Sequence, residues 1–162
     1  MKKKIWMIIS LAILFITTFS IWNWLESSNQ ASRDFSKDVV NSPVSEKIVK
    51  MNSNQYQNGH EFISYYHEFY NETLCYGRIE IANYSNQKGA AKEIIETLKN
   101  IEVQNDKLKE DFQQIEKYAQ KVVEKDDRNA MRMLHRLFHD LDIYFNGYSY
   151  NTTFGVTKFE GN

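Results

Sequence analysis

The pattern of hydrophobic positions divides the chain into one long apolar run and several later stretches with helical spacing. Residues Ile5–Leu25 carry no charged side chain and follow Lys2–Lys4. At a rise of about 1.5 Å per residue, an apolar helix of this length crosses the roughly 30 Å hydrocarbon core of a membrane. The pattern therefore predicts a transmembrane helix over residues 5–25.

The flanks of this run indicate its orientation. Lysines lie on its N-terminal side, and Trp22 and Trp24 lie where an aromatic anchor at the opposite interface is expected. We therefore expect a single-pass protein of the cell membrane, with residues 1–4 in the cytoplasm and the bulk of the chain outside. A cleaved secretory signal is the alternative, although such signals have a shorter apolar region of about 7–15 residues.

A polar linker separates the anchor from the rest of the chain. Residues 26–42 are rich in serine and mixed charges and poor in large apolar side chains, which is typical of a flexible segment. Ser42 and Pro43 suit the start of a helix, because serine accepts hydrogen bonds from first-turn amides and proline is tolerated there. We therefore expect one helical domain over residues 43–162.

Helical spacing begins at once in this domain. Apolar side chains follow steps of four and three over Val44–Met51 and again over Phe62–Leu74. This predicts one long helix or two, with the break at Gly59 because glycine weakens a helix interior. Gly77 closes the region, and Arg78–Tyr84 is either a short strand or a connector.

The longest regular pattern runs from Ile94 to Val122, with steps of four and three throughout. It predicts a single helix of some forty residues that starts at Ser85 or Asn86. Asn105 would then lie on the apolar seam, where a buried asparagine fixes the register of a parallel coiled coil. The wide apolar stripe instead favours packing against two neighbours within one chain, and this is the preferred interpretation.

The last helix is bounded by clear signals. Asp126 and Asp127 suit its N-terminal cap, and Asn146-Gly147 suits its C-terminal end. The preceding turn is short, which predicts an antiparallel helical hairpin. The final segment, Tyr148–Asn162, has period-two character and is expected to be an edge strand or an extended strap, with Arg78–Ala82 as its candidate pairing partner. The overall prediction is a mostly α domain of three to four helices with a minor β pairing.

Charge and motifs exclude several classes of function. Removing Lys2–Lys4 from the twenty basic residues leaves seventeen against twenty-one acidic ones, a balance of −4 that does not suit a nucleic-acid binder. Cys75 is the single cysteine, so no intrachain disulfide forms, and a buried free thiol is the expected role. No glycine-rich phosphate loop or nucleophile elbow occurs. We therefore assign no catalytic residue and no cofactor.

The histidines are the candidate chemistry of the domain. His135 and His139 are four residues apart, so they share one helical face and have the spacing of two metal ligands. Asp142 continues this strip, and further ligands would have to come from the first helical region. The preferred interpretation is that these side chains border the core, and we assign no metal site. The candidates for those further ligands are His60, Glu61, His67 and Glu68.

Aromatic side chains gather in the same two regions and suggest either a glycan-stacking surface or a core, of which the core is preferred. The function expected from the sequence is a membrane-anchored extracytoplasmic domain with a non-enzymatic interaction, accessory or structural role. The alternatives are a metal-binding ectodomain that uses His135 and His139, and an envelope glycan-binding domain. Expected partners are membrane lipid around the N-terminal helix and a protein of the membrane or envelope, and no nucleic acid.

Overall fold

The computed structural model describes residues 44–52, 55–147 and 152–161. The predicted anchor over 5–25 and the linker over 26–42 lie outside these residues. Among the residues described, no helix combines the length and the apolar character needed to cross a membrane.

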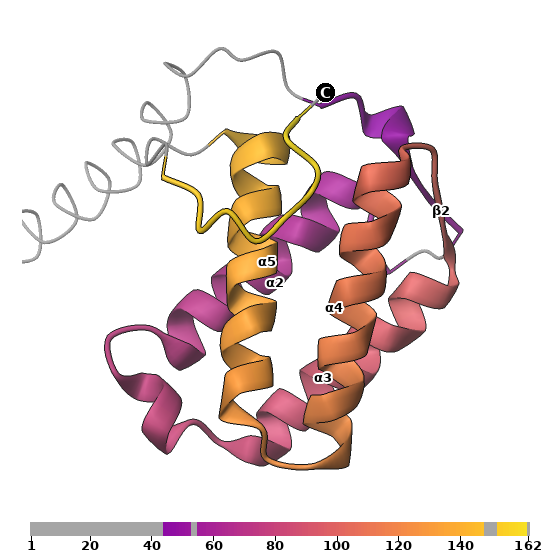
Figure 1. Ribbon diagram of the computed structural model, residues 1–162. Coiled ribbons are helices and arrows are strands. Elements are labelled where there is room, and N and C mark those ends of the chain that lie inside the picture. The colour runs from indigo at the N-terminus through magenta and orange to yellow at the C-terminus, as the bar shows by residue number, and fades with distance from the viewer. Residues whose placement is uncertain (1–43, 53–54, 148–151, 162) are drawn as a thin grey trace, which may run out of the picture. The chain divides into compact units, whose positions relative to one another are not determined.

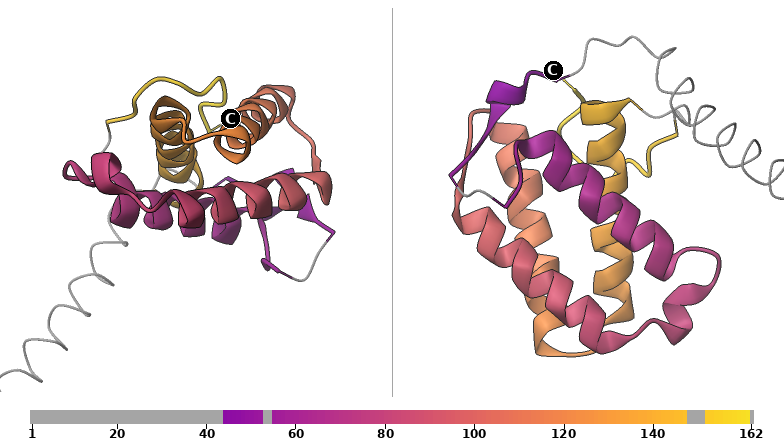
Figure 2. Two further views of the ribbon diagram at one scale, coloured as in Figure 1. Left: turned by 90° about the horizontal axis from the view of Figure 1, so that it is seen from below. Right: turned by 180° about the vertical axis from the view of Figure 1, so that it is seen from behind.

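Four α-helices lie within the described residues, in agreement with the mostly helical prediction. They are α2 (Gly59–Leu74), α3 (Tyr84–Lys99), α4 (Asp106–Glu124) and α5 (Arg128–Asn146). Figure 2 shows α2 and α3 in one layer and α4 and α5 in the other (see also Figure 1). The largest interfaces join α2 to α5, α3 to α4, and α4 to α5. The last of these is the predicted hairpin with its very short turn.

Each helix starts at a polar cap that the local sequence supplies. In all four cases the side-chain oxygen of the capping residue accepts a hydrogen bond from a backbone N–H three residues on, which satisfies a first-turn donor. The predicted cap at Asp127 is confirmed, and Gly147 ends α5 with a φ of 67°. The cap of α3 lies two to three residues before the predicted Ser85 or Asn86. The four capping residues are Asn58, Asn83, Asn105 and Asp127.

A two-stranded antiparallel sheet replaces the helix expected over Val44–Met51. After a 3-10 turn, η1 (Glu46–Ile48), the chain forms β1 (Val49–Met51), which pairs with β2 (Ile101–Val103). The buried side chain of β1 is Val49, which the predicted four-and-three spacing did not include. The prediction of a helix from residue 43 is therefore wrong within the described residues, since β-branched side chains suit strand pairing better than a short helix.

The forty-residue helix is also wrong, because the chain reverses direction between α3 and α4 through β2. Asn105 is not a seam residue: its side chain accepts from the backbone N–H of Leu108 at 3.0 Å and begins α4. The apolar spacing persists across the break because α3 and α4 both turn one face to the same core. A continuous coiled-coil seam through Asn105 is thus excluded.

Gly59 is the first residue of α2, at the position of the predicted helix break. It also lies close against β1, so that a larger side chain there should destabilise the domain. A Cβ atom at Gly59 would lie 2.7 Å from the Cβ of Val49, so alanine there must push β1 away. Overpacking costs about 1–3 kcal/mol, and the better helix propensity of alanine returns about 1. We expect Gly59→Ala to lower the free energy of unfolding by about 1 kcal/mol in urea titrations followed by circular dichroism.

Gly89 provides the matched control for this prediction. It lies within α3, and a Cβ atom there would meet no atom within 4 Å. Gly89→Ala should therefore leave the domain as stable or stabilise it by up to about 1 kcal/mol. Equal stabilisation by both substitutions would contradict the close approach of β1 to α2.

The core between the two helical layers is strongly aromatic. The ring of Phe62 in α2 lies 5.7 Å from Phe138 in α5 and 6.2 Å from Phe112 in α4, in edge-to-face geometry. Tyr66 and Tyr70 are also fully buried. The preferred interpretation of the aromatic side chains as core is confirmed for these residues, which join three helices.

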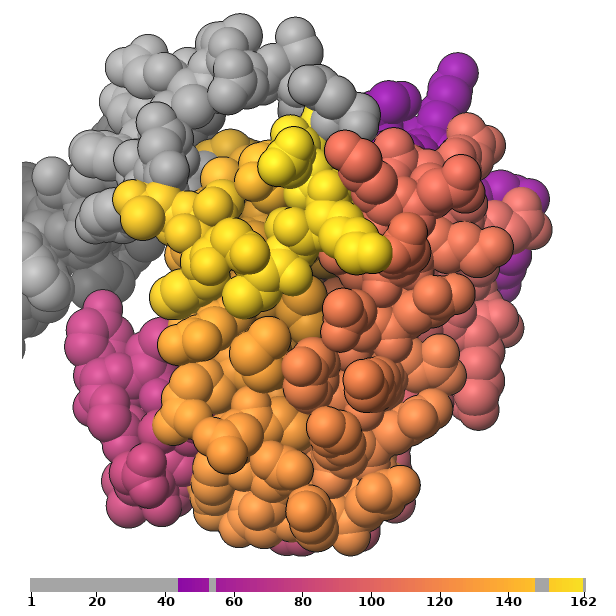
Figure 3. All heavy atoms as spheres, in the orientation of Figure 1, coloured from indigo at the N-terminus to yellow at the C-terminus, as the bar shows by residue number. Residues whose placement is uncertain are grey.

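Two further described segments, residues 78–81 and 152–161, contain neither α-helix nor strand. Arg78–Ile81 forms a 3-10 helix, η2, between α2 and α3. Residues 152–161 form no strand and lie across α4 and α5, as the yellow segment of Figure 3 shows. The expected strap is therefore confirmed for these residues, whereas their pairing with Arg78–Ala82 is wrong: their backbone amides bind carboxylates of α4 and α5 instead.

Candidate functional site

The interface between α2 and α5 contains a row of polar side chains, which we call the polar seam. The two helices are antiparallel, because His60 near the start of α2 contacts Asn146 at the end of α5, and Cys75 after α2 contacts His135. Helical spacing places these side chains on one face of each helix. The polar seam comprises His60, His67, Asn71 and Cys75 from the α2 side, and His135, His139, Asp142 and Asn146 from α5.

Three imidazole rings meet at the centre of the polar seam. His67 stacks on His135 with 6.0 Å between ring centroids, and it meets His139 edge-on at 5.0 Å. The predicted proximity of His135 and His139 is confirmed, with their centroids 6.2 Å apart. His67 joins them as one of the expected contributors from the first helical region. His60 contacts Asn146 and Phe145 instead.

The carboxylates of the predicted strip take other partners. Asp142 is fully buried, and its Oδ2 lies 2.6 Å from Nδ1 of His67 rather than against His135 or His139. Glu61 accepts from the backbone N–H of Gln57 at 2.6 Å, and Glu68 is exposed. Neither glutamate therefore joins the group of histidines.

Asn71 is the hub of the polar seam. His67 donates from Nδ1 to Asp142, so its Nε2 accepts from the amide of Asn71 at 2.9 Å. The amide oxygen of Asn71 then accepts from Nε2 of His135 at 2.9 Å and from the thiol of Cys75 at 3.5 Å. The hydrogen-bond network thus assigns a donor and an acceptor to each contact. Sequence reasoning missed Asn71, although it lies one turn after His67 and one turn before Cys75.

The network continues to the start of the described chain. Asn146 donates its amide to Asp142 and to the carbonyl of His60. The ring of His60 lies 3.0 Å from the Asn146 amide oxygen and 2.9 Å from the carbonyl oxygen of Val44. Both ring nitrogens of His60 therefore lie within hydrogen-bond distance of an oxygen acceptor. Side-chain hydrogen bonds therefore link Val44 to Cys75 through the α2–α5 interface.

Burial decides the protonation states of His135 and Cys75, which lie at the same end of the polar seam. Desolvation, with His67, His139 and Arg136 nearby, lowers the pKa of His135 to about 4. Desolvation raises the pKa of the Cys75 thiol, and Arg78 opposes this only in part. Both groups are therefore neutral at pH 7.

This electrostatic state does not suit nucleophilic catalysis. Cys75 Sγ lies 3.6 Å from Nε2 of His135, a distance at which a base accepts a thiol proton. That nitrogen already carries the proton it donates to Asn71. A reactive thiol needs a lowered pKa and a free base. The arrangement instead supports a neutral hydrogen-bonded cluster.

The same contacts bear on metal binding. In the described part of the chain, no group of three or more histidine, cysteine, aspartate or glutamate side chains has the geometry to hold a metal ion. The amide of Asn71 lies between His67 and His135 and forms a hydrogen bond with the Nε2 atom of each ring. Metal binding through His135 and His139 stays a prediction.

A second candidate site lies at the surface, on the segment that joins α2 to α3. Tyr76 is 94% exposed and Ile81 is 84% exposed, and we call these two side chains the apolar tip. Tyr76 has a φ of 56°, a left-handed conformation that costs a residue with a Cβ atom about 1–2 kcal/mol. Gly77 follows with a φ of 78°. The sequence indicated the turn through Gly77 but not the exposure of its neighbours.

The backbone behind the apolar tip is held by two arginines. Arg128 at the start of α5 donates to the carbonyls of Ile79 at 2.7 Å and Ala82 at 2.9 Å. Arg78 donates to the carbonyl of Asn71 at 3.0 Å, and its guanidinium lies 5.3 Å from the centre of the Tyr76 ring. The strained turn is therefore fixed to both α2 and α5. In Figure 1 it projects at the edge of the molecule, between α2 and α3.

Comparison with known proteins places the chain in no family: no protein-family model, no curated protein and no solved structure matches it.

Proposed function

We propose that this protein is a membrane-anchored interaction domain without enzymatic activity, held outside the cytoplasm by a helix over residues 5–25 and engaging a protein partner through the apolar tip. The observation that carries the proposal is the exposure of Tyr76 and Ile81 on a strained turn that Arg128 holds in place. A conformation that costs free energy persists only where surrounding contacts maintain it, and such positions cluster at functional sites.

The chemistry of the apolar tip suits a protein surface. Tyrosine and arginine are enriched where interfaces gain most of their binding energy, and Arg78 lies over the ring of Tyr76. A turn already fixed by Arg128 loses little conformational entropy on binding, which favours affinity. Isolated apolar side chains are common on protein surfaces. Here two such side chains lie on one short segment whose backbone accepts hydrogen bonds from Arg128.

The polar seam supports the non-enzymatic part of the proposal. Its thiol is protonated at pH 7, its His135 is neutral, and the amide of Asn71 forms a hydrogen bond with Nε2 of both His67 and His135. Such a network holds two helices in one register. We therefore assign the polar seam a structural role in positioning α2, from whose end the apolar tip projects.

A photo-crosslinking experiment on the full-length protein in its native membrane tests the proposal. A photoreactive amino acid replaces Glu80, an exposed residue between Tyr76 and Ile81. We expect a discrete protein adduct that falls by at least about tenfold when Tyr76→Ser and Ile81→Ser are added, since hot-spot residues each contribute about 1–2 kcal/mol or more. Tyr65→Ser, at an exposed aromatic residue on α2, is the matched control and should leave the adduct unchanged.

Two outcomes would contradict the proposal. One is the absence of any protein adduct at position 80, and the other is an adduct of equal yield in the double variant. The anchor is tested in the same membranes: alkaline carbonate should leave the protein in the membrane pellet, and its release would show that residues 5–25 do not anchor it.

A further inference from the structure

The sheet of β1 and β2 leaves one edge of β2 open within the described residues, where β2 has no second neighbouring strand. The residues on either side of β2, Asn100 and Gln104, bond to the backbone of the residues that flank β1, at 2.8 and 3.0 Å. In an antiparallel pair every second residue bonds to the partner strand, so Asn100, Glu102 and Gln104 face β1. The amides and carbonyls of Ile101 and Val103 therefore point toward the open edge.

The sequence of β2 does little to guard this edge. Native proteins block exposed edges with very short strands, prolines, lysines or bulges. β2 is short, which limits pairing to Ile101 and Val103, but it contains neither proline nor lysine. Its charged residue, Glu102, pairs across the sheet with Lys50 at 3.3 Å. The edge therefore suits a further strand over two residues.

A surface hollow of about 390 Å³ lies between β2 and the first half of α4. Its volume falls within the range of about 300–1,000 Å³ that is usual for ligand pockets. Apolar side chains of α3, β2 and α4 line it together with a polar rim. The apolar side chains are Leu98, Ile101, Val103 and Phe112, and the rim comprises Glu102, Lys109, Gln113 and Glu116. We call this hollow and the open edge of β2 together the edge groove.

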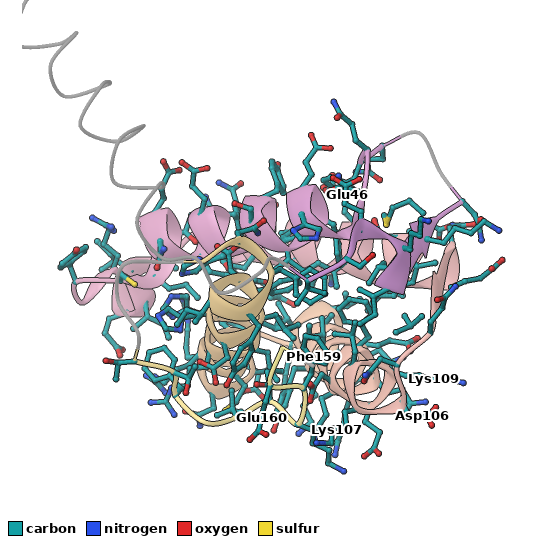
Figure 4. The ribbon with its side chains drawn as sticks, turned by 90° about the horizontal axis from the view of Figure 1, so that it is seen from above. Glu46, Asp106, Lys107, Lys109, Phe159 and Glu160 are labelled. Carbon is teal, nitrogen blue, oxygen red and sulfur yellow. The ribbon has the colours of Figure 1, made fainter. Side chains whose placement is uncertain are left out.

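The rim of the edge groove carries two charges of opposite sign. Lys109 and Glu116 are seven residues and hence about 10.5 Å apart along α4. The Lys109 side chain points away from the helix (Figure 4). In the part of the chain that the structure describes, neither residue belongs to a salt bridge. The rim is therefore complementary to a segment that carries both an acidic and a basic side chain.

From these observations we infer that the edge groove binds an extended peptide segment of a protein partner, which adds to β2 as an antiparallel strand. Backbone bonds to Ile101 and Val103 supply affinity, as in other cases of strand addition. Directly opposed residues of antiparallel strands point to the same face. The peptide residues that bond to Ile101 and Val103 are thus those whose side chains enter the hollow beside Phe112. The segment has apolar side chains at every second position, flanked by an acidic and a basic residue.

A second copy of this chain suits the edge less well than such a peptide. The register that uses both Ile101 and Val103 of two copies places Glu102 opposite Glu102 of the other copy. Like charges directly opposite each other destabilise a sheet. The edge groove also lies at the opposite end of α3 from the apolar tip, and α3 is about 24 Å long. It is therefore a second binding surface, and the inference does not rest on the proposed function.

Hydrogen exchange followed by NMR on the isotopically labelled full-length protein in detergent micelles tests the inference. The probe is a short peptide with blocked ends in which valine alternates with threonine, with glutamate at one end and lysine at the other. We expect a Kd between about 10 μM and 1 mM. At about nine-tenths occupancy, exchange of the Ile101 and Val103 amides should slow about tenfold, because it then proceeds only from the free protein. The Glu102 amide, which faces β1, is the internal control and should change little.

Two N-methylated peptides test the backbone bonds without altering the protein. Methyl groups on the valine nitrogens remove the amide hydrogens that face β2, whereas methyl groups on the threonine nitrogens remove those that face solvent. We expect the first peptide to bind at least about tenfold more weakly, through the loss of two or more hydrogen bonds, and the second to bind like the parent. Equal affinities of the two would overturn strand addition.

A surface substitution tests the charged rim. Lys109→Gln should weaken binding of the parent peptide about two- to fivefold, the range of an exposed ion pair. Lys107→Gln, at an exposed lysine of α4 that does not line the hollow, is the matched control and should bind as the wild type does. Equal weakening by both substitutions would show that the peptide does not lie along the rim.

Two further outcomes would overturn the inference. One is unchanged exchange of the Ile101 and Val103 amides at peptide concentrations up to about 1 mM. The other is slowing of the same amides that grows with protein concentration in the absence of peptide, which would assign the edge to a second copy. Crosslinking at position 80 depends on none of these results, so this inference and the proposed function fail separately.

Discussion

We expect Asp142→Ala to destabilise the domain by about 2–3 kcal/mol, because the buried His67 donor loses its acceptor at a cost of about 1–3 kcal/mol and a second hydrogen bond, from Asn146, is lost as well. The carboxylate is fully buried, accepts from Nδ1 of His67 at 2.6 Å, and accepts from the amide of Asn146. Alanine leaves the buried His67 ring without its acceptor and removes one of the two acceptors of the Asn146 amide, whose other partner is the carbonyl of His60. The loss should appear as a lower urea midpoint for the full-length protein in detergent micelles.

The choice of signal matters for this measurement. All three tryptophans, Trp6, Trp22 and Trp24, lie in the N-terminal region, so tryptophan fluorescence does not report on the domain. Far-ultraviolet circular dichroism follows the helices of the described domain directly. Asp142→Asn should be intermediate, because its amide oxygen still accepts from His67 while its NH₂ group faces the donor of Asn146.

Glu68→Ala is the matched control, since Glu68 lies next to His67 on α2 but is exposed. Its effect should stay within about 0.5 kcal/mol, as for most surface substitutions. Equal midpoints for Asp142→Ala and Glu68→Ala would mean that the buried pair contributes nothing to stability, and the structural role of the polar seam would have to be abandoned.

Helix periodicity predicted which side chains face the core more reliably than it predicted where helices end. Phe112, Ile115 and Val122 are buried, as their spacing required. The same spacing hid a reversal of the chain, because steps of four and three carry no information on direction. The local signals of the reversal were the β-branched Ile101 and Val103 and the capping side chain of Asn105.

The candidate site was also predicted only in part from the sequence. Helical spacing predicted that His135 and His139 share one face of a helix, and His67 was among the candidate side chains from the first helical region. The sequence could not give the register of α2 against α5, which pairs Asp142 with His67 and brings Asn71 between two rings. Such contacts depend on packing between helices that are far apart in the chain. The strap was expected, but not its carboxylate partners Asp111 and Asp140.

The second large effect that we expect is a loss of stability in mild acid that depends on His135. Burial and the adjacent His67, His139 and Arg136 lower the pKa of this ring to about 4, against about 6.5 in an unfolded chain. The unfolded state therefore binds a proton more readily. The neutral ring contributes its full stability above pH 6.5, and this contribution is lost as the pH falls toward 4.

For such a pKa difference, linkage gives a loss of up to about 2 kcal/mol between pH 7 and pH 5, which partial exposure of the ring reduces to about 1–2. We expect His135→Gln to remove this loss, because glutamine keeps a donor for Asn71 but does not titrate. Urea midpoints at the two pH values measure it. The window lies above the range in which Asp140 is protonated, since the pKa of that carboxyl is lowered.

Lys121→Gln, on the exposed side of α4, is the control and should retain the wild-type loss. A loss of the same size in His135→Gln would show that other groups cause the acid sensitivity. Because α2 carries the apolar tip at its end, protonation of His135 between α2 and α5 would also disturb the surface that we propose for the partner. Crosslinking at position 80 should therefore weaken at pH 5 in the wild type and persist in His135→Gln.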